Sequence, residues 1–427
     1  MTLEHIGLIF ATVVGACVGS FLNVVIYRVP EGRSIVSPPS ACPHCGHGLA
    51  WYDNVPILGW IWLRGRCRYC QASISPQYPI IEAVTAILFG GWFYLCYFTN
   101  LRPDFAGAGW SMTWGAMIVH MVLLAALLAA TLIDWRYYII PLSIPWTATA
   151  AAALLLPLVV WTTVMVDLPD AAPGGVPRTA GERLAEVREP YGHASAVQLA
   201  LARRERGSVE ISPAPLALPP WAGAGLGGAA GLLIALVGLW TKKLPQSFAD
   251  AEEHLAEAEA DNPHAWLAYP HARREMLKEI AFLAAPVLGA IVGWWLARDA
   301  AGPWPLWLRV LGGVLLGYLA GGAVVWGTRI LGTLSFGKEA MGLGDVHLMA
   351  AVGAVCGWAV PILAFFIAPF FGLTWAGLSA GLSRLLKREV RVIPYGPHLA
   401  LATVVVMVFR EPLMVYFGRL TTVVGPA

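Results

Sequence analysis

Charged residues are scarce in this chain of 427 residues. Lys, Arg, Asp and Glu together make up 13% of it, whereas a soluble globular domain carries roughly 25%. Neither sign dominates, because the formal net charge is only +2, and the sequence gives no reason to expect binding to a nucleic acid. Hydrophobic residues make up 58%, which is more than a soluble core can hide. The composition therefore predicts an integral membrane protein embedded in a lipid bilayer.

The basic segment that opens a secretory signal peptide is also missing. Glu4 is the only charged side chain before the first apolar run, at residues 6–26. This run is about 20 residues long, enough to cross a bilayer. Arg28 and Arg33 follow it. Because cytoplasmic loops are enriched in Lys and Arg, we predict a retained first span that starts outside the cell and ends in the cytoplasm.

Further apolar runs follow, each close to the length of a bilayer crossing. They lie at residues 79–98, 114–133, 140–165, 221–240, 280–298, 305–331, 345–360, 361–383 and 397–417. The 19 tryptophans suit such a chain, because Trp favours the interface between water and lipid. The predicted fold class is an all-α polytopic membrane protein with about ten transmembrane helices.

Three segments are polar enough to lie in water. Residues 28–78 hold four of the seven cysteines. Residues 166–218 are rich in Pro, Ala, Glu and Arg, a composition that predicts weak order. Residues 241–279 include an acidic stretch at 250–261, which we interpret as a solvated helix. A basic cluster predicts that residues 384–391 are cytoplasmic; it consists of Arg384, Lys387, Arg388 and Arg391.

Two Cys-x-x-Cys pairs, Cys42 with Cys45 and Cys67 with Cys70, stand 21 residues apart. One such pair can be a redox centre, whereas two at this spacing suit a tetrahedral Zn(II) site with four thiolate ligands. The reducing cytoplasm disfavours the alternative of two disulfides. A closed shell of four sulfurs leaves no position for water or substrate, so we predict a structural zinc.

The remaining candidate ligands fit this zinc site less well. His44 and His47 lie beside the first pair, but four cysteines already complete the shell. Cys17, Cys96 and Cys356 lie in apolar runs, where a small packing residue is the simpler interpretation.

Two aspartates lie at the ends of apolar runs. Asp134 ends the run 114–133, and Asp345 opens the run 345–360. A carboxylate at a membrane span marks function by default, although either one alone could be an interfacial charge that reaches water. Two neighbouring carboxylates share a proton, so one acts as general base on a water and the other as general acid toward a scissile amide. We predict such a pair, which titrates as a unit and leaves the two roles unassigned.

Two glycines support the second aspartate. Gly342 and Gly344 precede Asp345 in the pattern Gly-x-Gly-Asp. Glycine permits an unwound backbone that other chains can approach closely. We expect this backbone to admit an extended substrate beside Asp345.

Five separated motifs, in order, resemble those of the bacterial prepilin peptidases, the bifunctional leader peptidase and N-methyltransferase family of intramembrane aspartyl proteases. The resemblance covers residues 15–165 and 305–417, about 60% of the chain. The motifs are Gly19-Ser-Phe-Leu-Asn23-Val-Val-Ile-Tyr-Arg28; the cysteine loop with Trp51-Tyr-Asp53-Asn54-Val-Pro56, Arg64-Gly-Arg66 and Tyr78-Pro79 through Glu82; Asp134; the Gly-x-Gly-Asp that ends at Asp345; and Ile393-Pro394-Tyr-Gly396-Pro397.

The resemblance implies a protease of type IV prepilins or pseudopilins, with Asp134 and Asp345 as its catalytic residues. Cleavage is expected on the cytoplasmic side, after a glycine that ends a short basic leader. Many members then methylate the new N-terminus with S-adenosylmethionine, an activity tied to the cysteine loop. No glycine-rich nucleotide motif marks a pocket for that cofactor, so its binding residues stay unassigned. The supporting residues implied are Gly342, Gly344, His347, Pro394, Gly396 and Pro397.

These expectations divide the chain into five parts within a bacterial inner membrane, with the active site facing the cytoplasm. The parts are a first span at 1–27, a zinc loop at 28–78, spans with the first aspartate at 79–165, an insertion at 166–304, and spans with the second aspartate at 305–427. The resemblance implies a core of about eight spans, and the insertion is expected to add two. Because two is even, both aspartates stay on one side of the bilayer. The insertion is one departure from the family pattern, and His347 is a second, because the family usually has Lys at that position.

Other functions stay open at this point. A non-catalytic scaffold of the pilus or type II secretion machinery could share the fold, but the presence of both aspartates argues against it. A proton-relaying transporter would leave the cysteine loop and the Gly-x-Gly-Asp unexplained. A protease without methyltransferase activity is the third alternative. The sequence indicates neither the individual substrate nor an oligomeric state.

Overall fold

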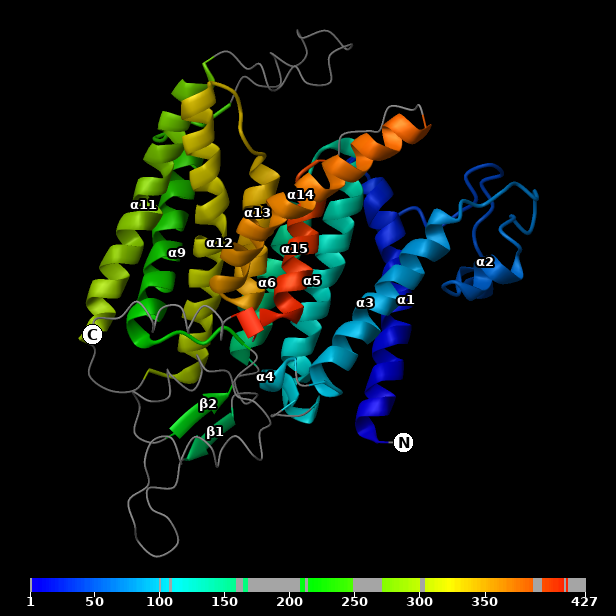
Figure 1. Cartoon of the computed structure of the whole chain (residues 1–427), viewed down its shortest axis with the longest axis horizontal. Helices are drawn as coiled ribbons and strands as arrows, with labels where there is room; N and C mark the ends of the chain where they lie inside the picture. The colour runs from blue at the N-terminus through cyan, green and yellow to red at the C-terminus, as the bar shows by residue number, and fades with distance from the viewer. Residues whose placement is uncertain are drawn as a thin grey trace, which may run out of the picture. The chain divides into compact units, whose positions relative to one another are not determined.

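The structure is a computed structural model of the whole chain. It describes residues 2–99, 101–106, 110–158, 164–167, 208–211, 214–248, 271–299, 304–386, 394–410 and 412–413. The chain forms two compact units. The N-terminal unit consists of residues 1–144, 161–213 and 406–427, and the C-terminal unit of residues 145–160 and 214–405. Helices dominate both units (Figure 1).

The N-terminal unit is built on a close pair of helices, α1 (Leu3–Arg28) and α3 (Gln77–Tyr97). Their backbones nearly touch at Gly19, because a Cβ built there would lie 2.6 Å from the Cα of Glu82. One turn further along α1, the amide of Asn23 donates to the carbonyl of Tyr78 at 3.2 Å. Small residues and buried amides are the features that hold helices together in lipid. Both lie in the first motif of the resemblance.

A buried charge pair lies at the start of α4 (Pro103–Ala106), the short helix that precedes α5 (Trp110–Tyr137). Arg102 donates two hydrogen bonds to Asp104, at 2.9 and 2.6 Å. Each residue is only 1% exposed, and the guanidinium lies 5.0 Å from the ring centre of Trp92. A buried ion pair is tolerated when its hydrogen bonds are satisfied in this way.

Two small pieces complete the N-terminal unit. The cysteine loop contains the 3-10 helix η1 (Trp51–Asn54) and the short helix α2 (Leu58–Trp62). Strands β1 (Val164–Asp167) and β2 (Ser208–Ile211) pair antiparallel. The ribbon is a finding that the sequence analysis did not predict, and it takes up the end of the apolar run at 140–165.

The C-terminal unit holds the remaining helices (Figure 1). They are most of α6 (Ser143–Leu158), α9 (Pro219–Trp240), α11 (Ala272–Arg298), α12 (Leu306–Phe336), α13 (Leu343–Cys356), α14 (Ala359–Leu386) and most of α15 (Gly396–Val408). Helix α13 is the most enclosed of them, since every residue from Leu348 to Cys356 is buried. The unit therefore has its core around the helix that begins beside Asp345.

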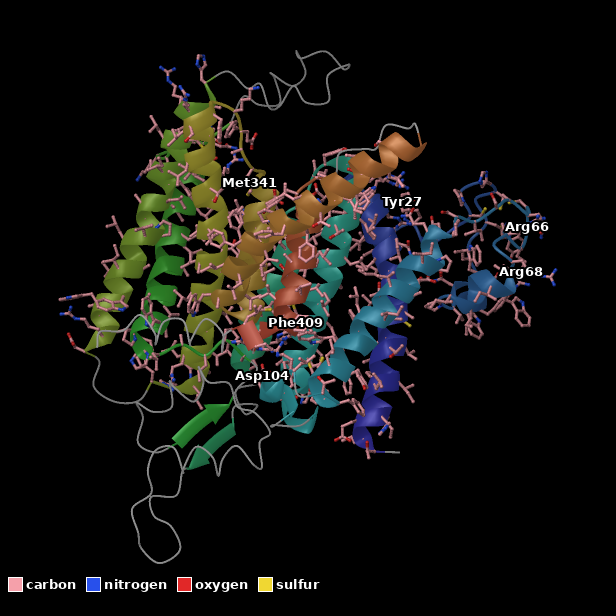
Figure 2. All side chains as sticks on the ribbon, in the orientation of Figure 1. Tyr27, Arg66, Arg68, Asp104, Met341 and Phe409 are labelled. Carbon is pink, nitrogen blue, oxygen red and sulfur yellow. The ribbon has the colours of Figure 1, made fainter. Side chains whose placement is uncertain are left out.

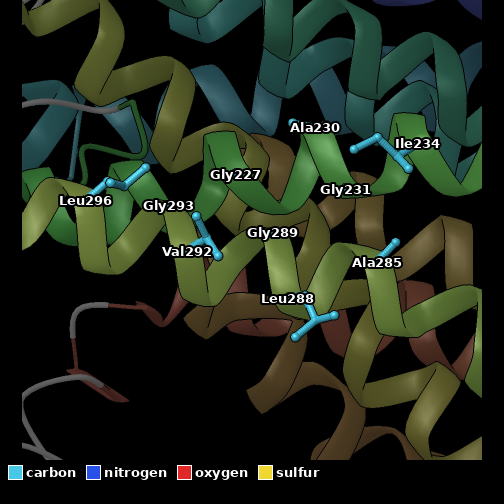
Figure 3. A pocket seen from close by; sticks show the side chains of 10 residues that line it. All are labelled: Gly227, Ala230, Gly231, Ile234, Ala285, Leu288, Gly289, Val292, Gly293 and Leu296. Atoms are coloured by element: carbon cyan, nitrogen blue, oxygen red, sulfur yellow. The ribbon is translucent and has the colours of Figure 1, made fainter.

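Helices α9 and α11 cross on a stripe of glycines (Figure 3). A Cβ on Gly227 would lie 2.2 Å from the carbonyl oxygen of Gly289, and one on Gly223 would lie 2.4 Å from that of Gly293. Only small residues allow backbones to approach so closely. The same crossing lines an apolar pocket. Helix packing thus accounts for this glycine-rich run.

Among the residues that the structure describes, seven helices are long and apolar enough to cross a membrane: α1, α3, α5 from Thr113, α9, α11, α12 and α14 up to Ser383. The apolar helices α6, α13 and α15 are shorter, at 16, 14 and 13 residues. The helical membrane fold is confirmed, with the β1–β2 ribbon as its one addition in the described residues, whereas the count of ten spans is not confirmed. The acidic stretch 250–261, most of the segment 166–218 and the basic residues 387–391 lie outside the described residues.

Candidate functional site

The two Cys-x-x-Cys pairs form two hairpins of the same shape. An isolated β-bridge closes each hairpin. Within each, the amide of the first cysteine donates across the turn to a carbonyl at 2.9 Å. These bonds run from Cys42 to His47 and from Cys67 to Ala72. A tight turn of this kind directs both sulfurs of a pair to one side, as metal-binding knuckles require.

The hairpins bring all four sulfurs together, within 4.8 Å of one another. Sγ of Cys42 lies 3.8 Å from Sγ of Cys70, and Sγ of Cys45 lies 3.9 Å from Sγ of Cys67. A tetrahedron with metal–sulfur bonds of about 2.3 Å has edges of about 3.8 Å. The cluster therefore fits a four-coordinate metal ion, and its four-cysteine ligand set is confirmed as one that can hold a metal.

Electrostatics within the loop favour a thiolate and a rigid scaffold. The backbone amides of Cys45 and His44 lower the pKa of Cys42 to about 6. Arg68 donates to both carboxylate oxygens of Asp53, at 2.9 Å from Nε and 2.5 Å from Nη2, and these bonds lower the pKa of Asp53. Figure 2 shows Arg68 on this loop. A deprotonated thiol is the form that binds a metal.

The loop is also tied to the first turns of α3, because the amide of Ile57 donates to Oε2 of Glu82 at 2.7 Å. Within the loop, the indole of Trp60 donates to the carbonyl of Ile74 at 3.1 Å. The backbone of Glu82 lies next to Gly19, where α1 and α3 meet. The first two motifs of the resemblance therefore form one continuous structure.

Asp134 lies one turn before the end of α5 and is 5% exposed. Its carbonyl accepts a bond from the amide of Tyr138 at 2.9 Å. Two residues further on, the guanidinium of Arg136 lies 4.8 Å from the ring centre of Tyr27, which Figure 2 shows on α1. The first aspartate is thus set in a packed end of the N-terminal unit, beside the last turn of α1.

Asp345 lies in the first turn of α13 and is half-buried. A carboxylate there interacts favourably with the N-terminal end of the helix dipole. It lies over Gly342, because a Cβ built on that glycine would be 3.5 Å from Oδ2. Gly342 is the extended N-cap, while Gly344 is already helical. The backbone beside Asp345 is therefore less unwound than the sequence analysis expected.

Asp134 belongs to the N-terminal unit and Asp345 to the C-terminal unit. Each carboxylate sits at the end of its own apolar helix, as the sequence analysis expected. The approach of the two carboxylates to one another stays a prediction.

His347 lies between two aromatic side chains of the C-terminal unit. The indole N–H of Trp146, on α6, donates to Nδ1 at 3.4 Å, and the hydroxyl of Tyr318, on α12, lies 3.1 Å from the same atom. An indole nitrogen can only donate, so Nδ1 must accept and the proton of a neutral imidazole lies on Nε2. This arrangement favours a neutral side chain where a lysine would bring a positive charge.

The turn before α15 lies within reach of the charge on Asp345. Pro394 precedes the helix, and Gly396 and Pro397 are its first two residues. Burial first, and the negative charge of Asp345 second, raise the pKa of Tyr395 to about 12. The last motif of the resemblance is therefore part of the surroundings of the second aspartate.

The sequence analysis missed a buried charge cluster next to this aspartate. Arg329, on α12, bonds to Glu279 of α11, to Glu339 and to the carbonyl of Met341. Figure 2 shows Met341 near the start of α13. An arginine inside an apolar run was the signal for it, because a charge within a span marks function by default.

Comparisons with known proteins match two parts of the chain. Residues 13–96 match the family described as Bacterial Peptidase A24 N-terminal domain, and residues 272–377 match the Type IV leader peptidase family. The first match contains the four cysteines and the second contains Asp345, while Asp134 lies in neither. The second match begins inside the segment 166–304. No solved structure matches the chain.

Curated relatives carry names of the same kind. A "Prepilin leader peptidase/N-methyltransferase" of Myxococcus xanthus is 44% identical over 151 residues, 35% of this chain and 41% of the relative. One of the same name from Pectobacterium carotovorum is 38% identical over 31% of this chain and 52% of the relative. A "Type 4 prepilin-like proteins leader peptide-processing enzyme" of Escherichia coli is 36% identical over 34% and 56%.

The chain spans about half the length of these relatives. The matched regions hold the paired hairpins of the cysteine loop and the aspartate that opens α13. Residues 13–96 are therefore similar to the N-terminal domain of bacterial A24 peptidases, and residues 272–377 to the type IV leader peptidase family.

Proposed function

We propose that this chain is an aspartic endopeptidase that removes the basic leader of type IV prepilins or pseudopilins at the cytoplasmic face of the bacterial inner membrane. The observation that carries the proposal is the position of Asp345, in the first turn of α13 and inside the matched leader peptidase domain. Its half-buried carboxylate lies next to Gly342, and a residue without a side chain would let a substrate backbone approach closely. The names of the curated relatives support the choice of substrate.

The proposed chemistry uses Asp134 and Asp345 as one acid–base pair. The ionised aspartate takes a proton from a water molecule, whose oxygen attacks the carbonyl carbon of the scissile peptide bond. The protonated aspartate donates its proton to the leaving nitrogen, so that the C–N bond breaks into a carboxylic acid and an amine. Because the two carboxylates share a proton, either can take either role in the sequence-based assignment.

We propose Zn(II) as the metal of the four-cysteine cluster. Four cysteine sulfurs suit zinc, and bound zinc would close the loop between the hairpins. Cys42, Cys45, Cys67 and Cys70 would hold it, with no position left for substrate. The site is therefore structural and takes no part in peptide cleavage.

We also propose that the enzyme methylates the new N-terminus of its product. S-adenosylmethionine would supply the methyl group to that amine. The support is the name shared by several relatives together with the cysteine loop in the matched N-terminal domain. We assign none of the described residues to the binding of S-adenosylmethionine, and we derive no step from it.

For the membrane arrangement we propose the division made from the sequence, with spans at 1–27, 79–165 and 305–427 around the zinc loop and the insertion. Helices α9 and α11 would be the two inserted spans. Lys242 and Lys243 follow α9 directly, which supports a cytoplasmic position for the next segment.

Cleavage of a prepilin by the purified full-length chain tests the proposed function. The protein, in detergent or liposomes, is mixed with a prepilin that carries a basic leader, and the product is identified by mass spectrometry. We expect one cut after the leader glycine, and none when that glycine is replaced by valine. Intact substrate after incubation with the wild-type protein overturns the peptidase. If the product is cut but carries no added methyl group in the presence of S-adenosylmethionine, the methyltransferase proposal is overturned and the peptidase proposal stands.

A further inference from the structure

The loop that leads into Asp345 is held by two side chains one turn apart on α12. This loop, residues 337–342, joins α12 to α13. Thr333 accepts a hydrogen bond from the amide of Ala340 at 3.2 Å. Arg329 donates to the carbonyl of the next residue, Met341, and to the carboxylate of Glu339. Met341 immediately precedes the N-cap of α13. The backbone just before the catalytic helix is therefore bound directly to α12.

Arg329 is itself held from another helix. Glu279, on α11, accepts from Nε and Nη2 of Arg329, at 3.2 and 3.1 Å. The indole of Trp326, also on α12, donates to Glu279 at 2.6 Å. Arg329 is 3% exposed and Glu279 is 4% exposed. The ring of Phe248 covers the guanidinium at 5.2 Å.

Burying the charge of Arg329 costs free energy, and apolar packing alone cannot offset that cost. A buried arginine is destabilising unless its charge and its hydrogen bonds are satisfied. The planar guanidinium can face two partners at once, whereas an ammonium cannot match this geometry. Here one edge bonds to Glu279 and the other to the loop. Arg329 therefore links α11 to the loop before Asp345, so that a shift of α11 would move the loop.

From this geometry we propose that Glu279 and Arg329 are positioning residues for Asp345. Glu279 fixes the orientation of the guanidinium of Arg329. The guanidinium in turn fixes the position of the carbonyl of Met341, and thereby that of the first turn of α13. Helix α11 lies in the segment that the sequence analysis treats as an insertion. The inference rests on the proposed function for its effect on cleavage, and on the described contacts alone for its effect on the loop.

Two measurements test the proposal on the full-length protein in detergent. The first is hydrogen exchange of the peptide that covers residues 337–342. We expect Glu279→Gln and Arg329→Met to speed this exchange about tenfold, because the loop opens locally once its anchor is weakened. The second is prepilin cleavage, where we expect kcat to fall by about 10–100-fold with KM within about twofold, since a small misplacement of a catalytic group has an effect of that size.

Arg309→Met is the matched control. Arg309 is also a buried arginine of α12, but it donates to the carbonyl of Ala217, far along the helix from the loop. We expect its loop exchange and kcat to equal those of the wild type, even if its thermal stability falls. In the double variant Glu279→Gln with Arg329→Met, the loss should not exceed that of Arg329→Met alone, because Glu279 acts through the arginine.

The outcomes separate the two claims. Wild-type exchange in Glu279→Gln, or equal effects of Arg309→Met and Arg329→Met, overturns the positioning role. If Arg329→Met does not fold, Arg329→Lys replaces it, with an intermediate loss expected for a point charge without the planar fork. If the wild-type protein cleaves no prepilin, the proposed function fails, while the exchange measurement still decides whether Glu279 and Arg329 hold the loop.

Discussion

The cysteine loop of the N-terminal unit and the Asp345 loop of the C-terminal unit are fixed by different forces. The cysteine loop is long, and its four sulfurs converge within 4.8 Å in a polar, largely exposed segment. The Asp345 loop spans residues 337–342 and is bound by Arg329 and Thr333 of α12, with Glu279 behind them. The first can be held together by a metal ion bound to its four sulfurs, and the second is held by buried hydrogen bonds and charges.

The difference predicts how each loop responds when one of its stabilising side chains is replaced. A metal site gathers its folding energy in one ion, so loss of two ligands removes it as a whole. A buried polar network spreads the energy over several bonds, and removing one partner leaves the others unsatisfied. The cysteine loop should therefore fail independently of peptide cleavage, whereas the Asp345 loop and cleavage should fail together.

The largest expected effect is on catalysis itself. Asp345→Asn and Asp134→Asn should each reduce leader cleavage by a factor of about 10³ or more, since either change removes one half of the acid–base pair. Zinc content should stay at the wild-type level, because the cysteine loop does not depend on these carboxylates. Quantitative cleavage assays with equal amounts of membrane-inserted protein measure the effect. Normal processing by either variant would falsify the catalytic assignment.

The second prediction changes the cysteine loop and leaves the Asp345 loop intact. The variant Cys42→Ser with Cys67→Ser should lose its zinc, starting from about one ion per chain, because a tetrahedral site needs all four sulfurs. Protease sensitivity of residues 28–78 should rise as the loop loses folding energy. Metal analysis and limited proteolysis give the readouts. Cys96→Ser serves as control, since this cysteine is buried in α3 away from the cluster. Full zinc content in the double variant contradicts the site.

A smaller effect concerns the helix pair that supports the cysteine loop. Gly19→Ala should lower the free energy of unfolding by about 1–3 kcal/mol, because the new Cβ would meet the backbone of α3 at 2.6 Å. Gly91→Ala is the control, since a Cβ on Gly91 meets nothing within 4 Å. Thermal unfolding of the two variants in detergent compares them. Equal midpoints would show that α1 and α3 do not approach as closely as the structure has them.

The smallest effect depends on pH. The bonds from Arg68 lower the pKa of Asp53 in the folded loop, so this carboxylate stabilises the fold above its unfolded pKa of about 4 and loses that contribution as the pH falls through its folded pKa. Asp53→Asn should lower the midpoint of loop unfolding slightly at neutral pH, and the two proteins should converge in acid. Glu31→Gln, which disrupts an exposed pair with Arg33, should change nothing. A difference between Asp53→Asn and wild type that grows in acid contradicts this reasoning.

Much of the candidate site could be predicted from local patterns. The spacing of Cys42, Cys45, Cys67 and Cys70 led to a single cluster because each knuckle is formed within a few residues, and only two such pieces had to meet. The helix that carries Asp134 in its last turn and the helix that carries Asp345 in its first turn followed from their apolar runs. The ends of these runs were less predictable. Within its described residues, the run 140–165 contains α6 (Ser143–Leu158) and the start of β1 (Val164–Asp167).

The sequence by itself determined that this protein is helical and membrane-embedded, which cysteines cluster, and which aspartates stand at helix ends, because composition, spacing and period act locally along the chain. The tertiary structure decided that Arg329 joins Glu279 to the backbone before Asp345, and that His347 lies between Trp146 and Tyr318. These contacts join residues that lie far apart in the chain. A hydrogen bond between distant side chains exists only once the intervening helices have packed, and no local pattern encodes it.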